Sequence, residues 1–269
     1  MNKEIVIGIT LYNPNQSTKD RILKTMESGY DVFIFDNSPE KMDYQDLFKS
    51  NNSVKARFHY YTCGKNVGLG YAISTLCAQA YYELNSALIF FDQDTMFTQQ
   101  TLEYIENMYI ESKEQIKEYS AINFLASNNH ESKEDKYKIE DVSLAINSGS
   151  LYILENVKKL NWHNIHFFVD CVDYEFCLKS YNNGYKIGLI NQTPGFDHFS
   201  EQGDLKFKIF GKEYQGRPYK SSRLKDYTLS SLKLIFKSLL TGNFYYFRVF
   251  IVSLLKYWFV QIYIRFIKQ

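Results

Sequence analysis

The stretch Ala87-Leu88-Ile89-Phe90-Phe91-Asp92-Gln93-Asp94 decides the fold of this chain. Its five apolar residues predict a fully buried β-strand, and two carboxylates follow where that strand ends. In open α/β sheets, ligands bind outside the carboxyl ends of the strands. Carboxylates separated by one residue suit a hard cation such as Mg²⁺ or Mn²⁺, which also takes phosphate oxygens of a substrate. An acidic turn without a ligand is the alternative.

Segments typical of strands alternate with segments typical of helices around this stretch. Strands are predicted over 4–11, 31–35, 58–61, 120–124 and 185–190, and a turn that leads into a strand over 147–153. Helices are predicted over 18–28, 101–118 and 173–182. A further helix is predicted to follow Gly70 and to end near Asn85. This alternation predicts an α/β fold with βαβ units and a mostly parallel central sheet, covered by helices on both faces.

Length and cysteine content narrow the class of protein. A chain of 269 residues can bury a large core. Its four cysteines form no C-x-x-C pair, so reduced and mostly buried thiols are expected and a structural zinc site is not. No apolar run near Met1 is long enough for a signal peptide, which predicts a cytosolic N-terminus.

Charge is divided unevenly along the chain. Residues 219–269 hold nine Lys or Arg and one acid, whereas the whole chain holds 31 basic and 30 acidic residues. Residues 1–218 therefore hold 22 bases and 29 acids, a net charge of −7, against +8 for the tail. We predict a domain over 1–218 and a basic, aromatic helical segment over 219–269 that meets an anionic surface. Nucleic-acid binding is not expected, because the positive charge is confined to an apolar helical tail.

The tail has the pattern of amphipathic helices. Apolar residues in its first half fall near helical spacing, with Lys233 and Lys237 one turn apart on another face. Residues 244–267 are long enough to cross a bilayer, but Arg248 and Lys256 interrupt them, and a charge at mid-membrane is costly. We therefore favour helices that lie in the membrane interface over a transmembrane span. A helical hairpin packed on the body or on a second subunit is the alternative, which includes a homo-oligomer.

Six short motifs occur in order between residues 4 and 200. They are Thr10-Leu11-Tyr12-Asn13-Pro14, Phe35-Asp36-Asn37-Ser38, Gly64-Lys65-Asn66-Val67-Gly68, Phe91-Asp92-Gln93-Asp94, Asn147-Ser148-Gly149 and Phe168-Val169-Asp170-Cys171-Val172-Asp173-Tyr174-Glu175-Phe176. In these motifs the chain resembles the inverting family 2 glycosyltransferases, which have the nucleotide-sugar-binding fold called GT-A. In particular it resembles their bacterial rhamnosyltransferase-like branch, whose galactofuranosyltransferase relatives share the motifs.

The resemblance implies a binding site for a nucleotide-sugar donor. The implied donor-binding residues are Tyr12, Asn13, Asp36, Lys65, Asn66, Gly68 and Asp92. Asp36 would accept a hydrogen bond from N3–H of uracil or thymine; an Asx-turn at the end of a strand is the alternative. Gly68 would permit close approach of the backbone, and Lys65 would approach a phosphate unless it is simply solvated.

The resemblance also implies a divalent cation, Mg²⁺ or Mn²⁺, that neutralises the diphosphate leaving group. Asp94 would be its first ligand, and Asp92 would bind ribose or support the metal through water. His198 would complete the metal site from the far side; a surface or core histidine is the alternative.

A single catalytic base is implied at Asp173. It would take the proton of an acceptor hydroxyl while that oxygen attacks the anomeric carbon, so the configuration inverts in one displacement. Val172 stands where the family often has a first acid, which leaves Asp173 alone; a helix N-cap is the alternative role. Asp170 and Glu175 are expected to support the base or to contact the acceptor.

The implied activity is transfer of L-rhamnose from dTDP-L-rhamnose to a lipid-linked saccharide in bacterial surface polysaccharide (capsule) synthesis. Sugar transfer would take place at the cytoplasmic face of the membrane, to which the protein would bind peripherally. Arg217 and Arg223 would contact diphosphate or lipid phosphate. A UDP-hexose or UDP-galactofuranose is the alternative donor. A sugar nucleotidyltransferase is disfavoured because Leu11-Tyr12-Asn13-Pro14 replaces its glycine-rich loop, and a non-catalytic nucleotide-binding protein because Asp94 and Asp173 are both present.

Overall fold

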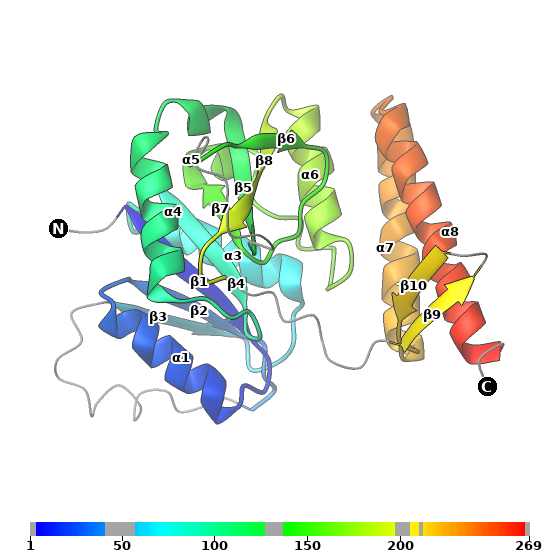
Figure 1. The fold of residues 1–269 in the computed structure, drawn as a ribbon, viewed down its shortest axis with the longest axis horizontal. Helices are drawn as coiled ribbons and strands as arrows, with labels where there is room; N and C mark the ends of the chain where they lie inside the picture. The colour runs from blue at the N-terminus through cyan, green and yellow to red at the C-terminus, as the bar shows by residue number, and fades with distance from the viewer. Residues whose placement is uncertain (1–3, 41–56, 127–136, 197–204, 210–211, 267–269) are drawn as a thin grey trace. The chain divides into compact units, whose positions relative to one another are not determined.

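The computed structural model describes residues 4–40, 57–126, 137–196, 205–209 and 212–266 (Figure 1). His198, the expected far-side metal ligand, lies outside these residues. The chain forms two compact units. Unit one comprises residues 1–168 and 172–198, and unit two comprises residues 169–171 and 199–269.

Unit one is built on one large mixed sheet. The strands are β1 (Ile5–Leu11), β2 (Val32–Asp36), β3 (Phe58–Thr62), β4 (Ala87–Asp92), β5 (Tyr119–Ala126), β6 (Glu140–Val142), β7 (Ser150–Ile153) and β8 (Lys186–Thr193). Among the described residues their order in the sheet is β3-β2-β1-β4-β7-β5-β8-β6. Strands β3, β2, β1 and β4 are mutually parallel, as are β5 and β8, whereas β7 and β6 pair antiparallel with their neighbours. The predicted mostly parallel α/β sheet is confirmed.

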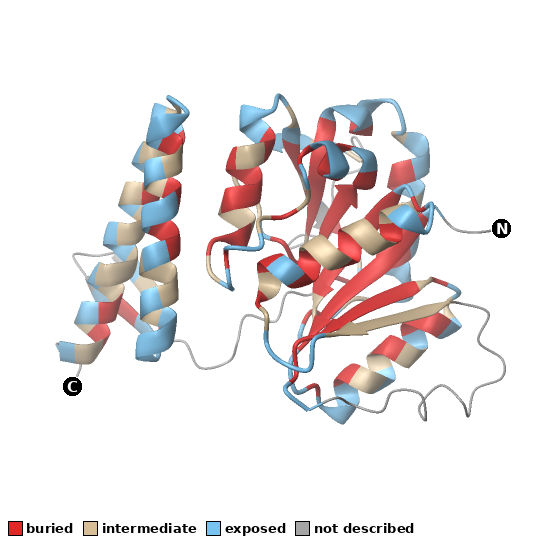
Figure 2. Ribbon diagram, turned by 180° about the vertical axis from the view of Figure 1, so that it is seen from behind, coloured by how far each residue is buried: buried red, intermediate tan, exposed pale blue. Residues whose placement is uncertain are grey.

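Helices cover both faces of this sheet (Figure 1). The helices of unit one are α1 (Gln16–Glu27), α3 (Leu69–Tyr82), α4 (Gln99–Glu111), the 3₁₀ helix η1 (Gln115–Glu118), α5 (Leu154–Lys159) and α6 (Val172–Asn182). Ile5, Ile7 and Ile9 of β1 join a buried cluster with Ile22 of α1 and Ile105 of α4. Helix α3 packs against β1, β2 and β4 and contacts α5. Because side chains alternate along a strand, the neighbouring positions of β1 face the other side, and Figure 2 shows the central strands buried throughout.

Two helix boundaries differ from the prediction. Helix α1 begins after Asn15, whose side-chain oxygen accepts a hydrogen bond from the N–H of Thr18 at 2.9 Å, so the helix starts before the predicted residue 18. Helix α4 has its N-cap at Thr98 and ends at Glu111, whereas the predicted helix ran from 101 to 118. The chain then returns as η1, which buries Ile116 in the core.

Unit two combines a small sheet with two long helices. Strands β9 (Leu205–Ile209) and β10 (Lys212–Gly216) pair antiparallel and are followed by α7 (Ser221–Leu240) and α8 (Phe244–Phe266). The β9–β10 sheet was not predicted, and it groups with the helices, so unit two includes residues before the predicted boundary at 218/219.

The two helices of unit two pack against each other. The Tyr227 and Tyr257 rings stack with centroids 3.8 Å apart, and the hydroxyls of Tyr227 and Ser253 lie 2.9 Å apart. The indole N–H of Trp258 donates to Thr228 Oγ1 at 3.1 Å. By length and composition alone, α8 is also a helix that could cross a membrane.

Candidate functional site

The parallel strands bring the ends of the predicted motifs to one edge of the sheet. In the register of unit one, Leu11 pairs with Asp36, Asp36 with Thr62, and Thr10 with Asp92. All four strands run in the same direction, so the loops after them emerge together. This edge is the ligand-binding edge of an open α/β sheet.

Hydrogen bonds tie the first of these loops to its neighbours. The backbone N–H of Tyr12 donates to Gln93 Oε1 at 2.9 Å, and that of Asn13 donates to Ser38 Oγ at 2.8 Å. Asn13 adopts a left-handed backbone conformation, with φ of 47°. The Tyr12 ring remains about half exposed, at 48%, and is therefore accessible to a nucleotide.

The loop before α3 is held in the same way. Asn37 Oδ1 accepts the N–H of Val67 at 3.1 Å, and its amide N–H donates to the carbonyl of Gly68 at 3.4 Å. Asn66 accepts the N–H of Gly68 at 2.9 Å, which closes a tight turn, and Lys65 is exposed beside it. Asn37 is thus a bridge between two motif loops, a role that the sequence did not reveal.

Asp36 is fully buried at the end of β2. Its Oδ1 accepts the N–H of Ser38 at 2.8 Å, and its Oδ2 accepts the hydroxyl of Tyr60 at 2.7 Å. The first bond is the Asx-turn that the sequence offered as an alternative. Both carboxylate oxygens thus have partners within the protein and the side chain has no exposed surface, so its proposed bond to a base N3–H stays a prediction.

Three carboxylates gather at the edge of the sheet. Burial, together with the charges of Asp94 and Asp173, raises the pKa of Asp92 to about 7, and a hydrogen bond from Thr10 opposes part of this rise. Asp94 is exposed, and Asp173 is partly buried in the first turn of α6. The predicted metal-binding carboxylates and the predicted base therefore lie close enough for their charges to interact.

Two partners that the sequence did not reveal fix the Asp92–Asp94 segment. Arg21 of α1 donates to the carbonyls of Gln93 at 2.9 Å and of Thr95 at 2.6 Å. Burial lowers the pKa of Arg21, and the charge of Asp94 opposes this effect. Ser148 Oγ accepts the backbone N–H of Asp92 at 3.1 Å. Neither contact follows a local pattern, because Arg21 and Ser148 are distant from this segment in the chain.

Two glycines let the segment before α6 approach α3 closely. A Cβ on Gly68 would lie 2.6 Å from the carbonyl oxygen of Phe168, and a Cβ on Gly70 would lie 2.5 Å from that of Phe167. The N–H of Leu69 donates to the Phe168 carbonyl. The backbone that approaches Gly68 closely is therefore that of Phe168. This contact joins the loop 64–68 to the chain that leads to Asp173.

The expected supporting residues have different surroundings. Glu175 is buried, accepts from Asn164 at 3.4 Å and lies 3.9 Å from the Lys179 ammonium, so it has a place in the packing of α6. In unit two, Asp170 lies 3.7 Å from Arg223, and the guanidiniums of Arg217 and Arg223 both lie over the ring of Tyr219.

The edge of the sheet offers part of a ligand set for a metal ion. Within the described ranges, no group of three or more His, Cys, Asp or Glu is arranged to hold an ion. Asp92 and Asp94 supply the carboxylate oxygens that Mg²⁺ and Mn²⁺ prefer, and their mutual repulsion is the kind that a dication relieves. These two residues fit such an ion, and further ligands would come from substrate phosphate, water or residues outside the described ranges.

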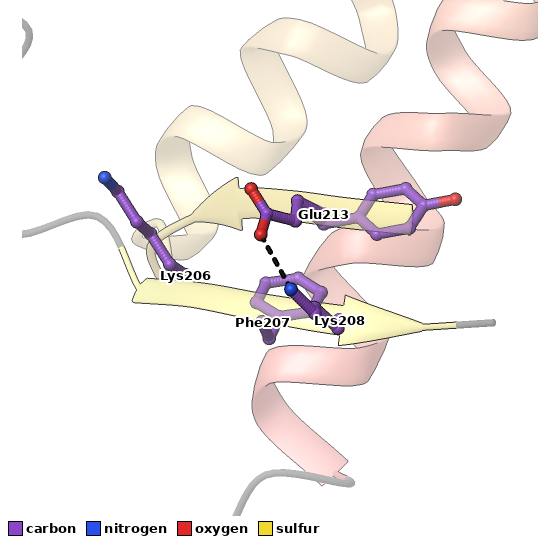
Figure 3. A pocket seen from close by; sticks show the side chains of 5 residues that line it. Lys206, Phe207, Lys208 and Glu213 are labelled. Atoms are coloured by element: carbon purple, nitrogen blue, oxygen red, sulfur yellow. Dashed lines mark ion pairs between the residues drawn. The ribbon is translucent and has the colours of Figure 1, made fainter. Parts of the chain in front are cut away.

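A shallow pocket on the β9–β10 sheet contains none of the predicted site residues. Its volume is about 400 Å³, and it is lined by Lys206, Phe207, Lys208, Glu213 and Tyr214 (Figure 3). An exposed ion pair joins Lys208 and Glu213 across it at 3.0 Å. We assign it no role in the chemistry.

Comparison with solved structures identifies the fold. S. aureus TarS 1-349 aligns with a TM-score of 0.53 and 13% identity over 86% of this chain and 65% of that chain. TarS 1-349 in complex with UDP-GlcNAc gives a TM-score of 0.51, with 13% identity over 86% and 66%. GalNAc-T7 with UDP, GalNAc and Mn²⁺ gives 0.54, with 12% identity over 84% and 47%. No protein-family model and no curated protein matches the sequence.

The likeness to these structures confirms the predicted GT-A fold. At 12–13% sequence identity, the likeness shows the fold alone. The chain spans about two thirds of the TarS 1-349 structures and about half of GalNAc-T7.

Proposed function

We propose that this protein is an inverting glycosyltransferase that moves a sugar from a nucleotide donor to a saccharide acceptor. The observation that carries the proposal is the meeting of Asp92, Asp94 and Asp173 at the carboxyl edge of the parallel strands. Two of these carboxylates suit a cation that would also bind the donor phosphates, and the third suits a general base. The GT-A fold supports this assignment by analogy, and the chemistry of the site supports it directly.

The donor that we propose is dTDP-L-rhamnose, on the motifs shared with the rhamnosyltransferase-like branch. Tyr12, Asn13, Asp36, Asn66 and Lys65 are the residues we expect around its nucleotide. A UDP-sugar is the second candidate, which is favoured by one observation: TarS has been solved with UDP-GlcNAc, and GalNAc-T7 with UDP.

In this proposal each residue at the edge has one task. Asp173 accepts the proton of the acceptor hydroxyl as the oxygen bonds to the anomeric carbon, and the bond from that carbon to the diphosphate breaks on the opposite face. Arg21 and Ser148 hold the Asp92–Asp94 segment in place by their backbone hydrogen bonds. No protein nucleophile is required, because a single displacement inverts the configuration.

Asp94 and Asp92 would hold Mg²⁺ or Mn²⁺, which would supply charge neutralisation for the diphosphate leaving group. His198 remains a proposed third ligand. The metal in the GalNAc-T7 structure is Mn²⁺.

We further propose that unit two docks on the anionic cytoplasmic face of a bacterial membrane, where a lipid-linked saccharide would be the acceptor. Two rows of exposed apolar side chains at helical spacing support this: Leu229, Leu232, Phe236 and Leu239 on α7, and Val252, Leu255, Phe259, Ile262 and Phe266 on α8. Lys233 and Lys237 lie beside the first row, and each basic residue near an anionic surface adds about 1 kcal/mol. Assembly through α7 and α8 into a homo-oligomer is the alternative.

Calorimetric titration with UDP and with dTDP, with and without Mn²⁺, tests the donor site. We expect metal-dependent binding to one of them, and its loss in Asp94→Ala. Asp20→Ala is the matched control, because Asp20 is an exposed acid on α1 and is not part of this edge. Binding that is unchanged by Asp94→Ala would contradict the assignment.

A further inference from the structure

Unit two contains an open pocket of its own, with both polar and apolar walls. Its volume is about 370 Å³, and it opens between the start of α7, α8 and the segment 169–171. The lining residues that matter here are Asp170, Tyr219, Arg223, Tyr227, Lys256 and Tyr257. We refer to this cavity as the tail pocket. Its size is at the lower end of the range for small-molecule sites, which corresponds to one sugar ring rather than to a large cofactor.

Two buried polar atoms in the tail pocket have no hydrogen-bond partner among the residues that the structure describes. They are Oδ2 of Asp170 and the hydroxyl of Tyr257. A buried polar group without a partner costs free energy, which a hydrogen-bonding ligand would recover. One is an acceptor and the other a donor, and the charge of Asp170 also raises the pKa of Tyr257 beyond the effect of burial, which keeps the phenol protonated.

The walls of the tail pocket are aromatic and held in place. The Tyr257 ring stacks on Tyr227 with centroids 3.8 Å apart and on Tyr219 at 6.0 Å. The Arg223 guanidinium lies 4.4 Å above the Tyr219 ring. An aromatic face packs well against the apolar C–H face of a sugar ring, while the hydroxyls at the ring edge reach polar groups.

The position of Asp170 is fixed by Asp226, the one acid of the tail. Asp226 Oδ2 accepts the backbone N–H of Asp170 at 3.0 Å and that of Val169 at 3.3 Å. Arg223 lies 3.7 Å from the other Asp170 oxygen. The unpartnered oxygen of Asp170 therefore belongs to a largely buried side chain whose backbone is hydrogen-bonded to Asp226.

These contacts discriminate between ligand classes. Arg223 and Lys256 would attract a phosphate, but a phosphate oxygen cannot donate to the unpaired Asp170 oxygen and is repelled by it. An apolar chain would leave both polar atoms unsatisfied. Neighbouring sugar hydroxyls satisfy both, since a hydroxyl donates to a carboxylate and accepts from a phenol.

We propose that the tail pocket binds one pyranose ring of the saccharide acceptor, with Asp170 and Tyr257 as its hydrogen-bonding residues. This inference rests on the proposed glycosyltransferase function. Asp170 precedes the proposed base Asp173 by three residues, and three residues of extended chain span at most about 11 Å. We assign the ring at Asp170 to the acceptor because Asp170 lies this close to the base along the chain.

Saturation-transfer NMR with the full-length protein tests the proposal. The probes are methyl α-L-rhamnopyranoside, methyl α-D-glucopyranoside, methyl β-D-galactopyranoside and N-acetylglucosamine, each titrated to obtain an affinity. We expect at least one to bind, Asp170→Asn to weaken it by about 10-fold or more, and Tyr257→Phe by about 3- to 10-fold. Tyr263→Phe is the matched control, because Tyr263 is also a stacked tyrosine of α8 but lies against Phe207, away from the pocket.

Donor binding measured on the same samples separates this inference from the proposed function. Asp170→Asn and Tyr257→Phe should bind nucleoside diphosphate as the wild type does, because both lie in unit two. If no pyranoside binds, or if the two variants bind it as tightly as the control does, the tail pocket is not a sugar site. If a pyranoside binds as expected but no nucleotide does, the pocket assignment holds and the donor assignment fails.

Discussion

Three glycine substitutions around the start of α3 separate backbone strain from steric exclusion. Gly64 has φ of +65° but open space where a Cβ would lie, whereas Gly70 has ordinary helical φ and backbone oxygens at 2.5 and 2.6 Å from that position. Gly68 combines both, with φ of +91° and the Phe168 carbonyl oxygen at 2.6 Å. The three alanine variants therefore isolate each effect and then their sum.

The expected losses of unfolding free energy follow from these geometries. Gly64→Ala should lose about 1–2 kcal/mol, the cost of a left-handed conformation for a residue with a Cβ. Gly70→Ala should lose about 2–3 kcal/mol in net, because the neighbouring atoms are backbone and can shift only by moving the chain before α6. This net loss already includes a gain of about 0.5–1 kcal/mol from the higher helix propensity of alanine. Gly68→Ala should lose roughly the sum, about 3–5 kcal/mol.

Urea unfolding followed by far-ultraviolet circular dichroism measures the series. The same variants should show loss of metal-dependent nucleotide binding in the order Gly64, Gly70, Gly68, since the α3 loop and the segment before Asp173 are displaced together. Gly184→Ala is a control for the first variant, because Gly184 has φ of +78° with no atom within 4 Å of a Cβ and is not in the site. If Gly70→Ala is as stable as the wild type, the close approach of these two backbones is wrong.

Three further perturbations probe the base, the core and the tail. Asp173→Asn should lower the transfer rate by about 10²–10⁴-fold with donor affinity unchanged; collapse of donor affinity would assign Asp173 to binding. Burial and the charge of Lys179 lower the pKa of His163 well below its usual value, so below about pH 6.5 the unfolded chain binds a proton that the folded protein does not. The free energy of unfolding should therefore fall by up to about 1.4 kcal/mol for each unit by which the pH is lowered below about 6.5. His163→Phe should flatten this slope in urea titrations. Replacing Lys233 and Lys237 by Gln should weaken flotation with anionic vesicles by about 30-fold at low salt, unlike Lys24→Gln; equal flotation would refute the electrostatic contribution.

Much of unit one follows from local sequence patterns. The run 87–91 forms the buried β4 as predicted, and 5–11 and 32–36 form parallel neighbours, because continuous apolar runs bounded by turns are typical of strands buried on both faces. Because these strands are parallel, their carboxyl ends lie at the same edge of the sheet, which brings Asp36 and Asp92 to that edge.

The contacts that position the site could not be predicted from the sequence. Arg21 holds the Gln93 and Thr95 carbonyls across more than seventy positions of chain, and such a contact has no local signature. Asn37 looked like part of a turn, yet its amide bridges two loops. The grouping of Asp170 with the tail is also non-local, since it depends on backbone bonds to Asp226.

The β9–β10 hairpin escaped prediction for a different reason. Lys206, Lys208 and Glu213 alternate with Phe207 and Tyr214, a weak two-residue period in short strands. Its aromatic side chains pack on α8, with Phe207 and Tyr263 stacked at 4.8 Å, so the pairing depends on a helix some fifty residues farther along the chain.

The release of nucleoside diphosphate from nucleotide sugars is the decisive measurement for the proposed glycosyltransferase. Purified protein would be incubated with dTDP-L-rhamnose, UDP-galactofuranose, UDP-glucose and UDP-N-acetylglucosamine, with Mn²⁺ or with a chelator, and the products followed by phosphorus and proton NMR. We predict that one donor is cleaved at its anomeric carbon with inversion, that the chelator abolishes the reaction, and that Asp94→Ala is inactive while Asp20→Ala is not. Cleavage that persists in Asp94→Ala, or retention of the anomeric configuration, would contradict the proposed metal site and mechanism.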